Sequence, residues 1–187
     1  MQQLFSQAIR FKKDDGTEYK EWEEKKLGDI SVKKSSNIAA NKLNENTGEF
    51  KIYGAKGFLQ KVDFFTEKQP YISIVKDGAG VGRTLLCESK TSVLGTLDII
   101  RNKGNSHLVF LYYLLKRIKF AKYIIGSTIP HIYYKHYSKE RIIFPCLAEQ
   151  QKIADFLSSI DKKLSLLEQQ IAKTKQYKKG LLQQMFV

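Results

Sequence analysis

Cysteine is scarce in this chain, and long apolar runs are missing. The 187 residues include two cysteines, Cys87 and Cys146, far apart in the sequence. A disulfide framework of the kind found in small secreted domains is therefore excluded, and two free thiols with no evident secretory leader predict a cytoplasmic protein. No apolar run approaches the ~20 residues that a membrane-spanning helix needs, so no membrane contact is expected.

Sequence motifs for catalysis or cofactor binding are also missing. The glycine-rich stretch at 78–84 lacks the lysine of a Walker A loop, and Arg83 stands where a dinucleotide fingerprint needs its third glycine. We interpret this stretch as a tight turn between two strands, with Arg83 at its rim as a candidate phosphate contact. Three prolines, at 70, 130 and 145, leave no place for the Asn-Pro-Pro-aromatic motif of an adenine methyltransferase.

Histidines are few and poorly spaced for a metal. His107, His131 and His136 have no ligand spacing with one another or with the cysteines. Neither a metal nor another cofactor is expected, and the sequence predicts a protein that is not itself an enzyme.

Acidic residues are absent from one long window. The chain carries a net charge of +13, and residues 99–139 hold eight Lys or Arg with no Asp or Glu. A basic window with interleaved aromatic residues favours a polyanionic partner, usually nucleic acid. The alternative is the solvated surface of an ordinary basic protein.

Polar groups suited to DNA follow inside this window. The segment 127–136 combines small hydroxyls, a proline turn, tyrosines and lysine, which reach phosphates and base edges without adding negative charge. The alternative is a hydrophilic loop held by Ile129 and Ile132 in the core. The predicted DNA-binding residues, of which Thr128 and Tyr133 are the base-side candidates, are Lys33, Lys34, Lys56, Arg83, Lys103, Ser127, Thr128, His131, Tyr133 and Lys135.

The hydrophobic pattern predicts an α+β body with a mixed or antiparallel sheet and a few helices. Short strands separated by glycine turns are expected at 50–53, 58–65, 71–76, 84–88 and 92–100. The period then changes to that of an amphipathic helix at 108–123, and a last strand is expected at 141–144.

A heptad pattern dominates the last forty residues. Steps of four and three residues continue without a break, and eight of the ten positions are apolar. The pattern predicts one helix over 147–186, about 60 Å long, whose apolar seam requires a partner helix. The apolar seam positions are Ile153, Leu157, Ile160, Leu164, Leu167, Ile171, Leu181 and Met185.

The first residues resemble the end of such a helix. The sequence Met-Gln-Gln-Leu-Phe at 1–5 repeats the pattern of Leu-Gln-Gln-Met-Phe at 182–186. We therefore expect a helix remnant and linker at 1–21, a compact α+β domain at 22–146 and a long helix at 147–187. The abrupt start suggests one module of a longer tandem arrangement.

The chain resembles the specificity subunits of type I restriction–modification systems. The resemblance is carried by 145–154, by Asp161, Glu168 and 178–186 in the predicted helix, and by patches at 22–30, 74–82 and 126–130. It implies two target recognition domains, each reading half of a bipartite DNA site, and two antiparallel helices that set the spacing. It also implies separate modification and restriction subunits that carry the catalysis.

This chain departs from that pattern because it has one recognition domain and one complete helix. We expect a half-subunit that binds double-stranded DNA and forms a homodimer through 147–186, or pairs with a separate first half. The competing hypothesis is a non-specific nucleic-acid-binding or interaction module that docks through its helix.

Overall fold

The centre of the body is a four-stranded antiparallel sheet. The computed structural model describes residues 1–43 and 48–185, apart from the side chain of Met185. The sheet has the order β2-β8-β5-β6. Its strands are β2 (Ser31–Ser35), β5 (Tyr71–Val75), β6 (Thr84–Cys87) and β8 (Leu97–Asn102).

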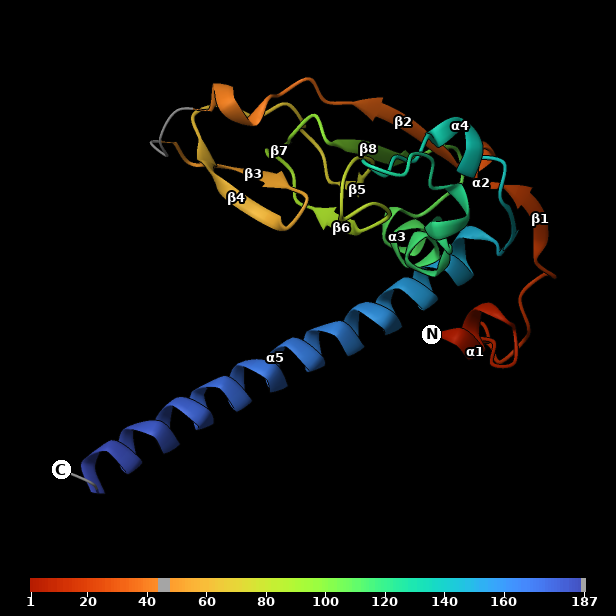
Figure 1. Ribbon diagram of the computed structural model, residues 1–187. Coiled ribbons are helices and arrows are strands. Elements are labelled where there is room, and N and C mark those ends of the chain that lie inside the picture. Colours follow the sequence, from red (N-terminus) through yellow and green to blue (C-terminus); the bar gives the residue numbers. More distant parts are fainter. Residues whose placement is uncertain (44–47, 186–187) are drawn as a thin grey trace.

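The strand β5 is buried along its whole length, because both of its faces are covered. Ile72 and Ile74 point into a core shared with the helix α3 (Leu108–Arg117). Tyr71 and Val75 point into a second core beneath a smaller sheet. The sheet thus separates two hydrophobic layers (Figure 1).

The smaller sheet has the order β4-β3-β7, from β3 (Phe50–Gly54), β4 (Gly57–Val62) and β7 (Ser92–Val93). Strand β7 runs parallel to β3, whereas β4 is antiparallel, so the predicted mixed and antiparallel character is confirmed. The single strand predicted at 92–100 is wrong. The chain leaves the small sheet at Gly95, whose N–H donates to the carbonyl of Ile38, and then joins the large sheet as β8.

Helix α3 ends earlier than its periodicity predicts, at Arg117 and not at residue 123. Ile118 is extended, and a 3-10 turn, η2 (Phe120–Tyr123), follows. The break lets Phe120 turn back into the core, where its ring packs edge-on against Tyr137 at 5.2 Å. Burial of this aromatic side chain outweighs the continuation of the helix.

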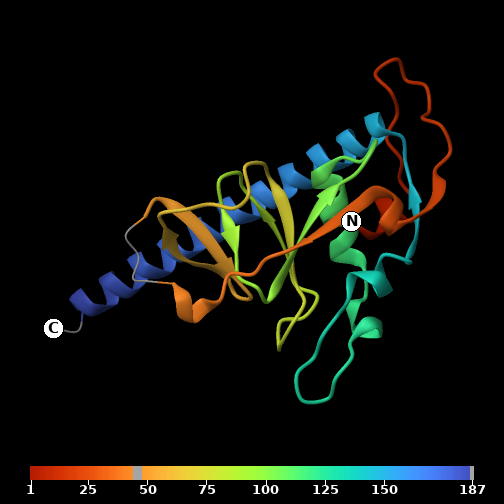
Figure 2. The ribbon, with the colours of Figure 1, turned by 90° about the horizontal axis from the view of Figure 1, so that it is seen from above.

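Short elements complete the body: α1 (Gln2–Phe5), β1 (Glu23–Lys26), α2 (Leu27–Ile30), η1 (Ala40–Lys42), α4 (Tyr134–Tyr137) and β9 (Arg141–Phe144). Strands β1 and β9 pair antiparallel, so segments from the two ends of the body meet just before the last helix. Figure 2 shows the loop between η2 and α4 projecting away from the sheet.

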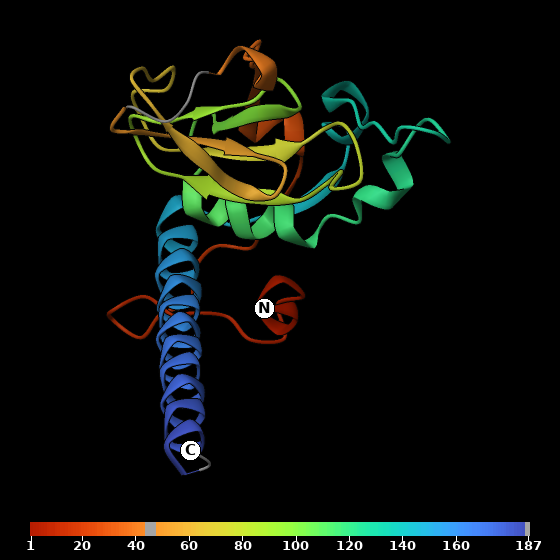
Figure 3. The ribbon, with the colours of Figure 1, turned by 60° about the vertical axis from the view of Figure 1, so that its left-hand side comes forward.

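The long helix α5 (Leu147–Met185) has a packed root and a free arm (Figures 1 and 3). At the root, Ile153 and Leu157 of the predicted seam are buried in the core shared with α3. The remaining described seam positions are exposed, at 37–54%: Ile160, Leu164, Leu167, Ile171 and Leu181. The side chain of Met185 and residues 186–187 lie outside the described part. The seam that one chain leaves open therefore begins at Ile160.

The N-terminal segment packs against the body. Leu4 and Phe5 belong to the core, and the ring of Phe5 lies 5.5 Å from that of Phe110. The division at 21/22 and 146/147 remains a prediction. None of the helices in the described residues combines the length and apolarity needed to cross a membrane.

Candidate nucleic-acid interface

A hairpin at 125–131 is fastened to the turn between β5 and β6. Ile125 and His131 exchange backbone hydrogen bonds of 2.9 and 2.8 Å. The N–H of Gly78 donates to the carbonyl of Pro130, and the N–H of Ile132 donates to that of Lys76, each at 2.9 Å. The glycine-rich turn and the predicted binding segment, distant in sequence, thus form one surface.

Glycine is required where this hairpin begins. Gly126 has φ +91°, and a Cβ atom there would lie 2.6 Å from the carbonyl oxygen of Ile129. The tight turn leaves Ser127 and Thr128 exposed at the tip. Ile132 is buried at 1%, whereas Ile129 is 56% exposed, so the core holds only one of the two isoleucines.

Asp77 joins the hairpin to the turn through its side chain. One carboxylate oxygen lies 2.7 Å from Nδ1 of His131, and the other accepts a hydrogen bond from Nζ of Lys76. Burial alone would raise the pKa of Asp77, but the hydrogen bonds from Lys76 and His131 outweigh it and hold this pKa below its ordinary value.

A pocket of about 440 Å³ opens beside this junction. It brings together three of the predicted binding residues, Lys33, Tyr133 and Lys135. The other lining residues are Ser35, Lys76, Asp77, Asp98, Ile132 and Tyr134. Tyr133 is 49% exposed, and Nζ of Lys135 lies 5.6 Å from its ring centre, so an aromatic face and a cation are presented together.

The buried carboxylate of Asp98 restrains a lysine at this pocket. Its Oδ1 accepts a hydrogen bond of 3.1 Å from Ser35 and lies 3.9 Å from Nζ of Lys33. Burial raises the pKa of Asp98, because the charged form is poorly solvated. Lys33 is therefore held over the strand edge, with a third of its side chain exposed.

Arg83 and Lys56 lie together on another flank of the β5–β6 turn. The Nη1 atom of Arg83 donates to the carbonyl of Ala55 at 2.8 Å, next to the exposed Lys56. The turn between β5 and β6 is confirmed as a connection between antiparallel strands, and it links the Arg83 side of this surface to the hairpin.

Lys34 and Lys103 lie apart from this group. Lys34 alternates with Lys33 along β2, so it points to the opposite face and pairs with the buried Glu67 at 2.7 Å. Lys103 follows β8 at the end of the sheet that carries Ile30, to whose carbonyl its N–H donates. The turn 76–83 lies at the opposite end of the sheet from Lys103.

The acid-free window does not form one cationic surface. Arg101 pairs with Glu67, and Lys122 pairs with Glu140, so acids from outside the window neutralise part of its charge. Arg117 lies over the ring of Phe5 at 4.6 Å, in a groove of about 400 Å³ near α1. Only Lys135 of the window's basic residues lines the pocket beside the hairpin.

Sequence reasoning missed Lys76, Asp77 and Asp98. Lys76 and Asp77 lie in the patch 74–82 that carries the resemblance, but the sequence alone does not show that Asp77 meets His131 or that Asp98 meets Lys33. Within the described residues, no cluster of three or more His, Cys, Asp or Glu side chains is arranged to hold a metal ion.

The chain carries the specificity domain of type I restriction–modification systems. Residues 19–176 match the family described as "Type I restriction modification DNA specificity domain". Because the match covers most of the chain, the chain belongs to this family, and the resemblance found from its motifs is confirmed.

Individual relatives agree with this assignment. The chain is 27% identical over 197 aligned residues to the type I restriction enzyme MjaVIII specificity subunit of Methanocaldococcus jannaschii, covering 97% of this chain and 46% of that protein. Among solved structures, the type I restriction–modification S subunit from M. genitalium matches with a TM-score of 0.70 at 19% identity, over 86% of this chain and 43% of that one. The HsdS subunit from Thermoanaerobacter tengcongensis matches with a TM-score of 0.52 at 17% identity, over 79% and 39%.

The chain spans slightly less than half the length of the curated relatives it matches. The two solved structures share its fold over a similar fraction of their own length.

Proposed function

We propose that this chain is the DNA sequence-specificity half-subunit of a type I restriction–modification enzyme. It reads one half of a bipartite site and positions the modification and restriction subunits, and it catalyses nothing itself. The observation that carries this proposal is the hairpin 125–131, which presents Ser127 and Thr128 beside a pocket lined by three lysines and two aspartates in a member of the specificity-domain family. A cytoplasmic location, where the chromosome lies, is part of the same proposal.

The predicted contacts differ in their roles in the proposal. Lys33, Lys56, Arg83 and Lys135 contact phosphates, because they are cations at the edges of the surface. Thr128 and Tyr133 reach base edges, since they are exposed, uncharged and next to the hairpin tip. Lys34 and Lys103 point elsewhere and contribute less to binding.

We further propose that two copies pair through the free arms of α5. The exposed seam from Ile160 to Leu181 leaves an apolar stripe, interrupted by Thr174 and Lys178, on a part of the helix that no other part of the described chain covers. Antiparallel pairing would bury it and place two recognition domains at opposite ends, related by a two-fold axis.

The salt dependence of binding tests the phosphate contacts. Lys135→Ala is expected to weaken binding to every duplex by a similar factor and to lower the slope of log K against log salt by about one, because one counterion fewer is released. The measurement is filter binding across a salt series. Lys61→Ala, on the outer strand β4, is the matched control and should leave the slope unchanged.

A slope that Lys135→Ala leaves unaltered would remove this lysine from the interface. No duplex binding at low salt, by the chain alone or with its modification subunit, would overturn the proposed function.

A further inference from the structure

The root of α5 is held on two faces, one by α3 and the other chiefly by the N-terminal segment. Helix α3 covers the face carrying Ile153, Ala154 and Leu157. Residues 10–14 cover a second face, which carries Glu149, Lys152 and Phe156 at helical spacing. A helix that is packed along one face can tilt about that face, whereas contacts on two faces fix the direction of its axis.

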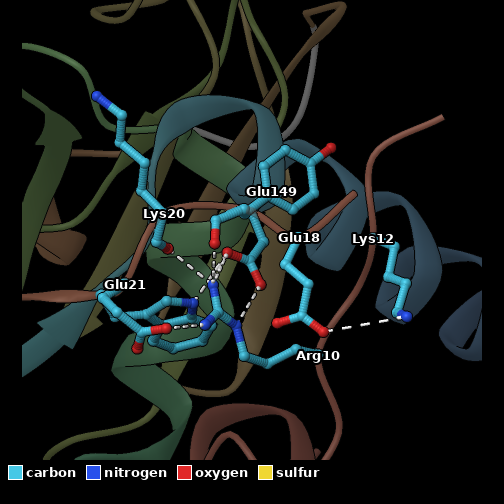
Figure 4. A network of polar contacts seen from close by, with 8 residues as sticks. Arg10, Lys12, Glu18, Lys20, Glu21 and Glu149 are labelled. Atoms are coloured by element: carbon cyan, nitrogen blue, oxygen red, sulfur yellow. Dashed lines mark hydrogen bonds and ion pairs between the residues drawn. The ribbon is translucent and has the colours of Figure 1, made fainter. Parts of the chain in front are cut away.

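The strongest contact on the second face is a buried ion pair between Arg10 and Glu149 (Figure 4). The guanidinium donates through Nε to Oε1 at 3.3 Å and through Nη2 to Oε2 at 3.2 Å. Glu149 is fully buried and also accepts a hydrogen bond of 2.9 Å from the indole N–H of Trp22. This two-point geometry fixes the orientation of the carboxylate as well as its distance from Arg10.

The same guanidinium also binds the returning part of the loop. Its Nη1 donates to Glu21 at 3.0 Å, and Nη2, which it shares with Glu149, donates to the carbonyls of Tyr19 and Lys20 at 3.2 and 2.7 Å. Arg10 therefore ties both sides of the loop 10–21 to the first turn of α5. The hydrogen bond with Glu149 raises the pKa of Arg10, and the guanidinium stays charged.

Two contacts further along the helix also attach this second face to the N-terminal segment. Nζ of Lys152 donates to the carbonyl of Lys12 and to Asp14, at 2.8 and 2.6 Å. One turn further, the rings of Phe11 and Phe156 meet edge-on at 5.6 Å. Tyr113 of α3 still donates a hydrogen bond of 3.0 Å to Asp161, and beyond Asp161 the helix projects from the body (Figure 1). A small tilt at the root therefore produces a larger displacement at the tip.

We infer that Arg10 and Glu149 are positioning residues that fix the direction of α5 relative to the recognition domain. From Asp161 to Met185 the arm is about 36 Å long, so a tilt of about 10° at the root moves its tip by about 6 Å, or roughly two base-pair steps of DNA. If the proposed function holds, this pair sets the precision with which two half-sites are spaced.

The test measures the direction of the helix without DNA. Spin labels at Lys61→Cys on β4 and Lys173→Cys on α5 report the domain-to-arm distance, in a Cys146→Ser background that retains the buried Cys87. Dilution with unlabelled chain removes distances between copies. The double variant Arg10→Met/Glu149→Gln neutralises both partners, so no uncompensated charge stays buried and the glutamine oxygen can still accept from Trp22.

In the double variant, the distance distribution is expected to broaden and its maximum to shift, while the melting temperature stays near that of the parent chain. Arg10→Lys keeps the charge but lacks the two-point geometry, and should give an intermediate width. The control pair Lys12→Ala/Glu18→Ala removes an exposed ion pair at 4.0 Å and should change nothing. An unchanged distribution in both Arg10 variants would overturn the inference.

A second experiment, with DNA, separates this inference from the proposed function. Selection from duplexes with variable gaps should give a wider range of gap lengths for the double variant than for the parent chain. Loss of all DNA selectivity in the parent chain would contradict the proposed function but leave the spin-label result valid. A normal gap preference with an unchanged distance distribution would refute only the role of Arg10 and Glu149.

Discussion

At the scale of single residues, Asp77 connects the hairpin 125–131 to the sheet. Its carboxylate contacts Lys76 and His131, and these hydrogen bonds lower its pKa despite partial burial. A carboxylate whose folded-state pKa is lowered stabilises the folded form above its ordinary pKa. That stabilisation is lost as the pH falls through the folded-state value.

Asp77→Asn is therefore expected to loosen the hairpin at neutral pH, with a loss on the order of 1 kcal/mol in the free energy of local opening. In the parent chain, the same loosening should appear only in acid, below about pH 4. The measurement is the amide-exchange protection factor of Ile125 and His131 as a function of pH. Asp63→Asn, at an exposed position after β4, is the control. Equal protection factors in the Asp77 variant and the parent chain at pH 7 would show that the carboxylate does not hold the hairpin.

Sequence reasoning located Tyr133 and Lys135 because the segment itself is distinctive, rich in hydroxyls and aromatic groups. It gave no reason to join this segment to Asp77, because the contact between Asp77 and His131 spans more than fifty residues of sequence. It also could not separate Lys33 from Lys34. Side chains alternate along β2, so Lys33 lies at the pocket and Lys34 pairs with Glu67. Which lysine lies on which face follows only from the register of β2 with β8.

At the scale of elements, one heptad seam of α5 serves two purposes: its first positions pack against the body, and its later positions are available to a partner helix. The heptad spacing predicted the helix almost to its ends, because the pattern is long and uninterrupted. It did not show that the first two seam positions pack within the chain. An apolar side chain follows the same period whether it meets α3 or a second copy. Likewise, periodicity extended α3 past Arg117, because burial of Phe120 has no local signature.

Two leucines on α5 separate the two tasks. Leu157 is buried at 4% and Leu164 is 52% exposed, so the same substitution should act differently at each. Leu157→Ala is expected to lower the free energy of unfolding of the body by about 2–5 kcal/mol. Leu164→Ala should leave that value nearly unchanged but weaken pairing of the arms.

Denaturant titration in dilute solution measures the first effect, and sedimentation at micromolar concentration measures the second. Similar losses of folding stability in both variants would mean that the arm is part of the body's folding unit. A chain that sediments as a monomer at every concentration would contradict pairing through the seam.

At the scale of the whole molecule, the chain is a compact domain with one projecting helix. The domain carries the hairpin and pocket, and the root of α5 is fixed by α3 and by the loop that contains Arg10 (Figure 3). Two such molecules with paired arms would place two identical surfaces a fixed distance apart. The composition and motifs predicted a non-catalytic DNA-binding half-subunit. The fixed direction of the arm depends on contacts between residues 10–14 and 149–156, which no local pattern reveals.

Selection of bound duplexes from a randomised library tests the central claim, sequence-specific reading, most directly. The account predicts two copies of one short motif as an inverted repeat with a constant gap, and predicts that Thr128→Ala relaxes the preference within the motif without changing the gap. A flat distribution of bound sequences for the parent chain, at a salt concentration where it binds DNA, would contradict the account.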